Sequence, residues 1–392
     1  MRAMNLSDKL VSAGHHVVLW SSSFNHQKKI HRSVGYKTYN VNNNLDIRLI
    51  PSCGYKDHIG FARLIDHAQM AWNLSKLLKE EKTTPDVAFI GYPPIETAAV
   101  MSRWLKKRGV PTLLDVKDLW PSILVDAFPR ILQPFARILL HPYFYLAKRT
   151  MTDVDGISTM SYSFLNWCLS FANKLPSAKD KIVRLTTLNI KSNEEKLNSA
   201  NQWWKKNHVN PDTYTSRVFF TGTFSTAFDF DQIRMAAEEI INCQFVLCGH
   251  GPCLDETKKL MKGLSNVVFP GWIDRLQMES LANMSIASLA PYKNVENFTL
   301  NIPNKIVDSL SLGSPILSPL QGEVATLIEN NSVGFTYDSD RLLSDCIQSL
   351  LDDNELQKKM SINAKKLYIK EFEFNKVYDN LVFHLEKLTN IN

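Results

Sequence analysis

Lys305 and Asp308 are a cation and a carboxylate three residues apart, a spacing that places both side chains on one face of a helix. Pro303 suits the first turn of that helix, whose free N–H groups and positive dipole end would then point into the preceding loop. Phosphate groups bind readily at such an end. Lys305 would add a positive charge, and Asp308, one turn deeper, would accept hydrogen bonds from hydroxyl groups. One site could therefore hold a sugar nucleotide by its pyrophosphate and its ribose.

The residues after this pair predict where the helix ends. Gly313 suits the C-cap, and Pro315 prevents the helix from continuing. Ile316-Leu317 then begins a buried strand. An ordinary amphipathic helix followed by a strand, with no ligand, would show the same pattern, so that interpretation stays open.

The segment from Asp308 to Pro315 resembles the nucleotide site of the retaining GT-B glycosyltransferases of family 4. That family has a Glu-x7-Glu motif ending in Glu-Ala-x-Ala-x-Gly-x-Pro, whose second Glu holds the ribose. Asp308 stands in place of this Glu, and Leu300 occupies the position of the first, so half of the motif is missing. Pro303-Asn304-Lys305 resembles a bacterial polysaccharide branch of the family. The resemblance implies an α/β fold of the GT-B type, two Rossmann-like domains facing a central cleft.

Length and composition favour an ordinary globular protein of two domains. The chain has 392 residues, of which 44% are hydrophobic and 21% charged. A net charge of +6 is too small to indicate nucleic-acid binding without a concentrated patch. The six cysteines include no CxxC pair and predict free thiols in a reducing compartment. No apolar run approaches the ~18 residues of a membrane span.

Short apolar runs alternate with amphipathic helices in the first half of the chain, which predicts a parallel sheet. The expected strands are 16–20, 47–51, 85–91, 111–116 and, as the last of this domain, 156–159, with a long helix at 59–78. A helix at 2–11 precedes the first of them, whereas the resembling enzymes begin with a strand and a glycine loop. We therefore expect that the chain starts at an internal methionine and lacks this first strand.

Two loops follow strands of this sheet, at the edge where ligands bind in parallel α/β sheets. The first is Gly91–Glu96; the second, Lys117-Asp118-Leu119-Trp120-Pro121, resembles a family loop that faces donor and acceptor. On this basis Lys117 and Asp118, together with Lys305, are the candidate catalytic residues. The candidate residues on the acceptor side are Tyr92, Glu96 and Trp120. Asp118 could instead be a simple helix cap.

The second half of the chain carries the expected donor site. Strands at 217–221 and 244–248 each end at a glycine turn, and strand 266–270 ends at Gly271-Trp272. The family places an Arg and a Lys after the first strand, but Gly222–Ala227 contains neither, so hydroxyl and backbone groups would serve there. The candidate donor-binding residues are Gly222, Thr223, Ser225, Gly249, Gly251, Trp272, Asn301, Asn304, Lys305 and Asp308.

The polar stretch 191–216 predicts the boundary between the domains. We expect an acceptor-binding Rossmann-like domain at 1–195 and a nucleotide-sugar-binding Rossmann-like domain at 216–370. A final helix within 371–392 would pack back toward the first domain.

The segment 130–149 combines four basic residues with an apolar and aromatic majority. Such a segment could lie on an anionic membrane surface, or it could be a core or interdomain helix.

Two metal-like patterns have simpler explanations. Asp229-Phe230-Asp231 and Asp153-Val154-Asp155 are both DxD, a short pattern that is common by chance. Asp229 and Asp231 more simply cap a helix at 232–241. His15-His16 has no further ligand at zinc spacing and is expected in a turn. We therefore expect no metal and no cofactor other than the nucleotide-sugar substrate.

The resulting hypothesis is a retaining glycosyltransferase that uses a nucleotide diphosphate sugar, expected to be UDP-linked, and a lipid-linked saccharide acceptor. It would act in capsule, O-antigen or exopolysaccharide synthesis, in the cytoplasm and peripherally on the inner face of the bacterial inner membrane. Three alternatives stay open: a UDP-sugar 2-epimerase, a non-catalytic or truncated relative, and a nicotinamide dehydrogenase. The last is disfavoured because no GxGxxG follows a strand.

Overall fold

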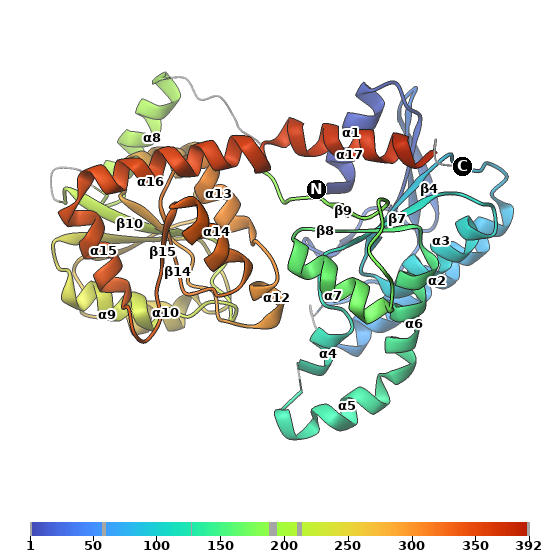
Figure 1. Cartoon of the computed structure of the whole chain (residues 1–392), viewed down its shortest axis with the longest axis horizontal. Helices are drawn as coiled ribbons and strands as arrows, with labels where there is room; N and C mark the ends of the chain where they lie inside the picture. Colours follow the sequence, from blue (N-terminus) through green and yellow to red (C-terminus); the bar gives the residue numbers. More distant parts are fainter. Residues whose placement is uncertain (1, 57–59, 127, 188–193, 210–213, 390–392) are drawn as a thin grey trace. The chain divides into compact units, whose positions relative to one another are not determined.

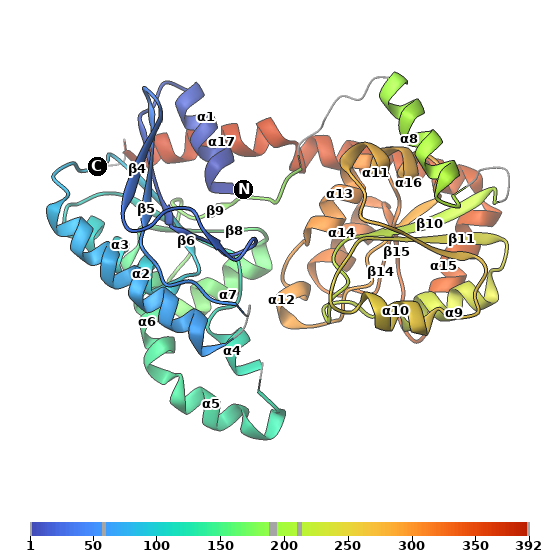
Figure 2. The ribbon, with the colours of Figure 1, turned by 180° about the vertical axis from the view of Figure 1, so that it is seen from behind.

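The computed structural model describes residues 2–56, 60–126, 128–187, 194–209 and 214–389. The chain divides into two compact units (Figures 1 and 2). Unit 1 comprises residues 1–183 and 378–392, and unit 2 comprises residues 184–377. The sequence placed the divisions within 191–216 and at 370. Both fall elsewhere because residues from Arg184 onward pack with unit 2, and the first residues of the last helix do the same.

Unit 2 is built on one six-stranded sheet in which every pairing is parallel. The strand order is β12-β11-β10-β13-β14-β15. The strands are β10 (Ser216–Thr221), β11 (Cys243–Cys248), β12 (Val267–Gly271), β13 (Ala287–Leu289), β14 (Ile316–Ser318) and β15 (Gly334–Thr336). Counted within the unit, this order is 3-2-1-4-5-6, the doubly wound α/β topology. The parallel α/β sheet expected from the sequence is confirmed.

The central strands of unit 2 are continuously apolar because helices cover both faces of the sheet. Val218, Phe219 and Phe220 of β10 are all buried. The helices around the sheet (Figure 1) are α8 (Glu194–Lys206), α9 (Asp231–Glu239), α10 (Leu254–Leu260), α11 (Arg275–Asn283), α12 (Glu296–Thr299), α13 (Asn304–Leu312), α14 (Glu323–Asn331), α15 (Leu343–Asp352) and α16 (Asn354–Leu367). A π-helical turn at Tyr368–Phe372 leads from α16 to α17 (Phe374–Thr389).

Helix α8 lies in the stretch that the sequence assigned to a polar boundary, and that assignment is wrong for Glu194–Lys206. The helix is held by one large apolar side chain, Trp204, which is fully buried. Its indole Nε1 donates to the backbone oxygen of Gln277 at 3.0 Å, at α11. The anchor is a tertiary contact, so the local composition could not indicate it.

Unit 1 contains one mixed sheet, one parallel sheet and a short hairpin. The sheet orders are β1-β5-β4, with β4 antiparallel, and β6-β7-β8-β9, and the hairpin pairs β2 with β3. The strands are β1 (Val17–Ser22), β2 (Phe24–Asn25), β3 (Ile30–His31), β4 (Lys37–Asn42), β5 (Leu45–Ile50), β6 (Ala88–Tyr92), β7 (Thr112–Val116), β8 (Gly156–Thr159) and β9 (Lys181–Ile182). β8 is therefore not the last strand of this unit, because β9 pairs with it.

The helices of unit 1 begin with the N-terminal helix that the sequence predicted. They are α1 (Arg2–Ser12), α2 (Phe61–Glu80), α3 (Ile95–Lys106), α4 (Ser122–Asp126), a 3-10 turn at Arg130–Leu132, α5 (Gln133–Leu139), α6 (His141–Asp153) and α7 (Tyr162–Ala172). None of the helices within the described ranges combines the length and hydropathy that crossing a membrane requires.

Helix α1 is fixed to unit 1 by polar contacts at several points. The guanidinium of Arg2 donates to Asp115 Oδ1 at 2.6 Å and to the backbone oxygen of Val183 at 3.0 Å. Asn5 donates to the hydroxyl of Tyr378 on α17 at 3.2 Å. Both views show α1 beside α17 (Figures 1 and 2). The C-terminal residues from 378 onward thus belong to unit 1.

Candidate functional site

The sheet of unit 2 reverses its winding between β10 and β13, which are hydrogen-bonded neighbours. In open α/β sheets ligands bind beyond the carboxyl ends of the strands at such a switch point. A small hollow lies there. Its lining includes Thr221 at the end of β10, Leu289 at the end of β13, and Lys305 and Asp308 of α13. Topology and side-chain chemistry therefore point to the same place.

Helix α13 begins and ends where the sequence predicted. Pro303 is its N-cap residue, and Gly313 adopts the left-handed conformation at the C-cap with φ of 67°. The backbone N–H of Lys305, in the first turn, donates to the hydroxyl of Tyr292. Asn304 is exposed at the first helical position. A phosphate at this end would thus meet the N–H of Asn304 first and would compete with Tyr292 for that of Lys305.

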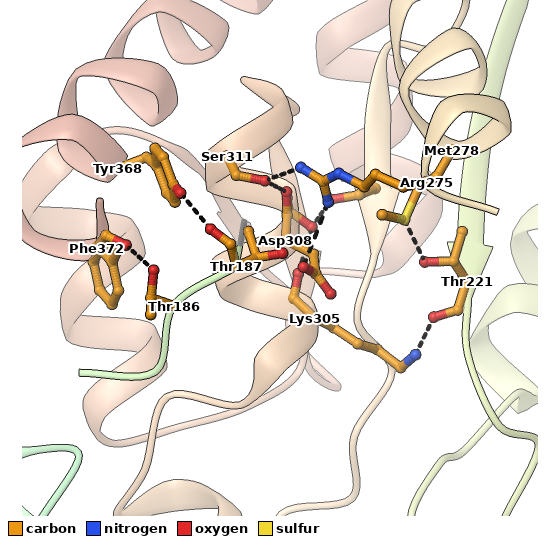
Figure 3. A network of polar contacts seen from close by, with 12 residues as sticks. Thr186, Thr187, Thr221, Arg275, Met278, Lys305, Asp308, Ser311, Tyr368 and Phe372 are labelled. Atoms are coloured by element: carbon orange, nitrogen blue, oxygen red, sulfur yellow. Dashed lines mark hydrogen bonds and ion pairs between the residues drawn. The ribbon is translucent and has the colours of Figure 1, made fainter. Parts of the chain in front are cut away.

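Lys305 is folded into unit 2 rather than extended toward solvent. Its ammonium donates to the backbone oxygen of Thr221 and lies 4.3 Å from the ring centroid of Phe220 and 5.0 Å from that of Phe228 (Figure 3). It occupies the space beside Gly222, where a Cβ would collide with it. Burial lowers the pKa of Lys305 to about 8, against the opposing influence of Asp308. The Lys305 side chain is therefore still positively charged near neutral pH, and it lies close to the rings of Phe220 and Phe228.

Three groups interact with the carboxylate of Asp308. Burial raises the pKa of this carboxyl group, and the three groups partly offset that rise. In order of influence, Arg275, the hydroxyl of Thr187 and Lys305 lower the pKa and so favour the ionised form. Arg275 Nη1 lies 3.6 Å from Asp308 Oδ1. The net result is a carboxylate with a raised pKa and a defined orientation, suited to accept hydrogen bonds.

Arg275 is itself fixed by a second contact to α13 (Figure 3). Its Nη2 donates to the hydroxyl of Ser311 at 2.7 Å, and that hydroxyl donates to the backbone oxygen of Asp308 at 2.7 Å. Sequence reasoning missed Arg275, although a signal was present: Asp274 and Gln277 form a capping box. That box predicts a helix start just after Gly271, and hence places Arg275 at this edge of the sheet.

Thr187 was also missed, and no local pattern marks it. It belongs to the segment from Arg184 to Thr187, which is attached to the π-helical turn. Its backbone oxygen accepts from the hydroxyl of Tyr368 at 2.7 Å, and the Thr186 hydroxyl donates to the backbone oxygen of Phe372 at 2.6 Å (Figure 3). The hydroxyl that reaches Asp308 is therefore presented by a segment held in place on its other side.

The glycine turns after β10 and β11 pack directly against each other. A Cβ on Gly249 would collide with the backbone oxygen of Gly222, and one on Gly251 would collide with that of Phe224. Backbone hydrogen bonds join the loops, from Gly222 to Cys248 at 2.9 Å and from Gly249 to Gly271 at 2.7 Å. These glycines thus allow neighbouring loops to approach each other. This packing explains why glycine occupies these positions, without any bound nucleotide.

The other expected donor residues are not all brought to this hollow. Thr223 is exposed, and Trp272 is 67% exposed at the end of β12. Ser225 instead lines a second hollow with Asp229 and other residues. Asn301 is only 5% exposed and donates to the backbone oxygen of Asn297 at 3.1 Å, so in this structure it is not placed to contact a nucleotide.

In unit 1, Lys117 and Asp118 follow β7 as expected. Lys117 Nζ lies 3.4 Å from Asp115 Oδ2 and is partly exposed. Burial raises the pKa of Asp118, while Arg63 and Lys117 oppose this shift. α4 begins only at Ser122, several residues after Asp118. These side chains offer one cation and one carboxylate at the carboxyl edge of the sheet.

Tyr92 and Trp120, expected on the acceptor side, are both buried within unit 1. Tyr92 is fully buried, and its hydroxyl donates to the backbone oxygen of Trp120 at 2.8 Å. Trp120 is 4% exposed, with the guanidinium of Arg63 4.8 Å from its ring centroid. The two cis peptide bonds before Pro93 and Pro94 lie directly after Tyr92.

Glu96 lies in a buried polar cluster that the sequence did not reveal. Its Oε1 accepts from the hydroxyl of Tyr143 at 2.6 Å, and its Oε2 lies 3.8 Å from Nδ1 of His67. Burial raises the pKa of Glu96 and lowers that of His67 to about 4, so the imidazole is neutral at pH 7.

The DxD pattern at Asp229 is part of a helix start. The side chain of Asp229 accepts from the backbone N–H of Asp231, the first residue of α9, at 3.0 Å. Over the described residues no group of three or more His, Cys, Asp or Glu side chains is arranged to hold a metal ion.

Part of the chain is similar in sequence to known proteins. Residues 215–353 match the family model "Glycosyl transferases group 1". Alpha-D-kanosaminyltransferase of Streptomyces kanamyceticus is 27% identical over 173 residues, which are 42% of this chain and 44% of that protein. The chain thus spans less than half the length of this curated relative.

Solved structures match nearly the whole chain. Sucrose-phosphate synthase from Thermosynechococcus elongatus matches with a TM-score of 0.69 and 13% identity, over 99% of this chain and 92% of that one. WaaG, a glycosyltransferase involved in lipopolysaccharide biosynthesis, matches with a TM-score of 0.65 and 14% identity, over 97% and 94%. Anabaena HepE in complex with UDP and glucose matches with a TM-score of 0.61 and 14% identity, over 88% of this chain and 86% of that one. The chain therefore has the GT-B fold, and its residues 215–353 match the family model of glycosyl transferases group 1.

Proposed function

We propose that this protein is a glycosyltransferase that takes a sugar from a UDP-sugar. The observation that carries the proposal is the position of Lys305 and Asp308 at the switch point of a group 1 domain. A cation and an oriented carboxylate at that edge match the diphosphate and the ribose of such a donor. UDP and UDP-glucose are the ligands named for the Anabaena neighbour, which supports uridine as the base.

In the proposed reaction the bond between the anomeric carbon and the diphosphate oxygen breaks, and an acceptor oxygen bonds to that carbon. Lys305 would leave the backbone oxygen of Thr221 and neutralise the charge that develops on the diphosphate, assisted by the start of α13. The departing phosphate would take the acceptor proton on the same face of the sugar, so the anomeric configuration is retained. No metal takes part in this scheme.

We place the acceptor, a lipid-linked saccharide, on unit 1. Lys117 and Asp118 are the side chains proposed to orient the accepting hydroxyl, since they lie at the carboxyl edge of its sheet. The corresponding role would be in surface polysaccharide synthesis, on the cytoplasmic face of a bacterial inner membrane. The lipopolysaccharide enzyme among the structural neighbours supports this assignment.

The test is an assay of the full chain with radiolabelled UDP-sugars and a lipid extract that supplies acceptors. We expect label to move into the lipid phase for one UDP-sugar, without added metal, and NMR of the product to show the donor's anomeric configuration. Conversion of a UDP-sugar to its 2-epimer without acceptor would contradict transfer. An inverted product would contradict the proposed mechanism.

A further inference from the structure

We propose that residues 128–139 of unit 1 are a docking surface for an anionic lipid bilayer. The stretch 130–149 is not one continuous helix, and its first part is largely exposed. The chain forms the 3-10 turn Arg130–Leu132, then α5 after Leu132, and a separate α6 after Leu140. Only α6 carries several buried residues, which include Ala147 and Met151.

The turn and α5 expose an unusual amount of apolar side chain. Ala136 is the buried residue of α5. Phe135 and Ile138 lie three residues apart on α5, which places them on one face, and Ile131 lies in the adjoining 3-10 turn. The exposed fractions are 85% for Ile131, 48% for Leu132, 69% for Phe135, 73% for Ile138 and 71% for Leu139. Contiguous apolar side chains left in water at this level mark an interaction surface.

The docking surface also projects from unit 1. α5 packs mainly against its chain neighbours α4, the 3-10 turn and α6, and Figures 1 and 2 show α5 at the far end of that group, away from the strands of unit 1. A short helix presented in this way can lie in the plane of a bilayer interface with its apolar face buried ~5–10 Å deep.

The charges decide which partner fits. From residue 127 to residue 152 the sequence contains Arg130, Arg137, Lys148 and Arg149 and no Asp or Glu. All four basic side chains are exposed. Arg130 and Arg137 lie on the same two elements as the apolar face, so that insertion would bring them to the level of the lipid headgroups. Apolar side chains together with exclusively basic charged groups match an anionic lipid surface. Each Lys or Arg near such a surface raises the affinity for the membrane about fivefold.

The inference stands on different residues from the proposed catalytic site and does not require it. The experiment is co-sedimentation of the full chain with vesicles of phosphatidylcholine alone or with added phosphatidylglycerol. We expect binding that requires phosphatidylglycerol and weakens in high salt. UDP binding, measured without vesicles, should be the same in every variant, so a failure here is distinguishable from a failure of the proposed function.

Two double variants and a matched control sharpen the test. Phe135→Ser with Ile138→Ser, and Arg130→Glu with Arg137→Glu, should each reduce vesicle binding by more than about tenfold. The control is Phe61→Ser with Ile65→Ser on α2, two apolar residues of the same unit that are 75% and 63% exposed. It should bind vesicles like the unmodified chain. Because all these side chains are exposed, the fold should be unaffected, which thermal unfolding would verify.

Three results would overturn the proposal. The first is no vesicle binding by the unmodified chain, and the second is an equal loss in the α2 control. The third is a dimer in solution that the Phe135 and Ile138 variant converts to a monomer, which would assign this face to a second copy of the chain.

Discussion

At the scale of single residues, the candidate donor site depends on how Lys305 and Asp308 are kept charged while partly buried. Arg275, Thr187 and Lys305 all favour the Asp308 carboxylate against the effect of burial. Lys305 has fewer compensating partners, so its pKa falls to about 8. The affinity for an anionic ligand should therefore depend on pH in a window set by this lysine.

We predict that UDP affinity is constant from about pH 7 to about pH 8 and then falls, approaching tenfold per pH unit. The pKa of Lys305 is lowered in the free protein, and a bound diphosphate favours the ammonium form. Above that pKa, binding must take up a proton, so affinity declines as pH rises. Calorimetric titrations between about pH 7 and 9 would measure this.

The matched control is Lys305→Met, which keeps a long side chain without the charge. It should bind UDP more weakly and lose the extra pH dependence, while UMP binding changes less because the proposed partner of the lysine is the diphosphate. If the decline above pH 8 persists in Lys305→Met, another group is responsible for it and Lys305 does not contact the ligand.

At the scale of elements, the site is assembled by segments that are distant in sequence. The segment from Arg184 to Thr187 is attached to the π-helical turn by three hydrogen bonds and directs one hydroxyl at Asp308. The hydroxyl of adjacent Thr186 donates instead to the backbone oxygen of Phe372 at 2.6 Å. The two threonines thus provide a matched comparison.

We predict that Thr187→Val weakens UDP binding by about 1.5 kcal/mol, the value of a hydrogen bond to a charged group. It should also raise the pKa of Asp308 further, so that the loss of binding on acidification begins at a higher pH. Thr187→Ser should restore both properties. Thr186→Val removes a comparable bond and should leave the UDP dissociation constant unchanged. Equal effects of the two valine variants would mean that Thr187 acts only on the fold.

Another element-scale prediction concerns the packing of the glycine turns. Gly249→Ala forces a Cβ into the backbone oxygen of Gly222, whereas Gly263, also at positive φ, has nothing within 4 Å of its Cβ position. Gly263→Ala should cost about 1–2 kcal/mol for the backbone conformation alone. Gly249→Ala should cost at least about 2 kcal/mol more. Urea unfolding followed by tryptophan fluorescence would compare them, and equal losses would show that the loops can separate.

Local signals explain which elements could be predicted from the sequence. α13 was predicted closely because Pro303 and Gly313 mark its two ends in the chain itself. β10 and β11 were predicted because strands covered on both faces are continuously apolar. β4 was not, since all its residues are exposed and only Tyr39 and Val41 among them are aromatic or apolar.

The candidate site could be predicted only in part for the same reason. Lys305 and Asp308 share one helix, so their spacing indicates their proximity. Thr187 reaches Asp308 through the fold, and no pattern near Thr187 marks this. The burial of Tyr92 and Asn301 likewise results from tertiary packing, which a strand-end or loop position does not reveal.

At the scale of the whole molecule, strand order carries most of the argument. The order 3-2-1-4-5-6 in unit 2 fixes a switch point between β10 and β13, independently of any motif. The motif residues lie at that point, although Leu300 replaces the first Glu of the family pattern and the loop after β10 has no cation. The topology, the match of residues 215–353 and the Lys305–Asp308 pair thus all support the proposed nucleotide site in unit 2.

The measurement that tests this most directly is calorimetric titration of the full chain with UDP, with GDP and ADP as base controls and EDTA present. We predict micromolar UDP binding, preferred over GDP and ADP, which Asp308→Ala weakens by about 1–3 kcal/mol because the ribose hydroxyls lose their acceptor. Failure of all three nucleotides to bind, or an unchanged UDP dissociation constant in Asp308→Ala, would contradict the assignment of this site.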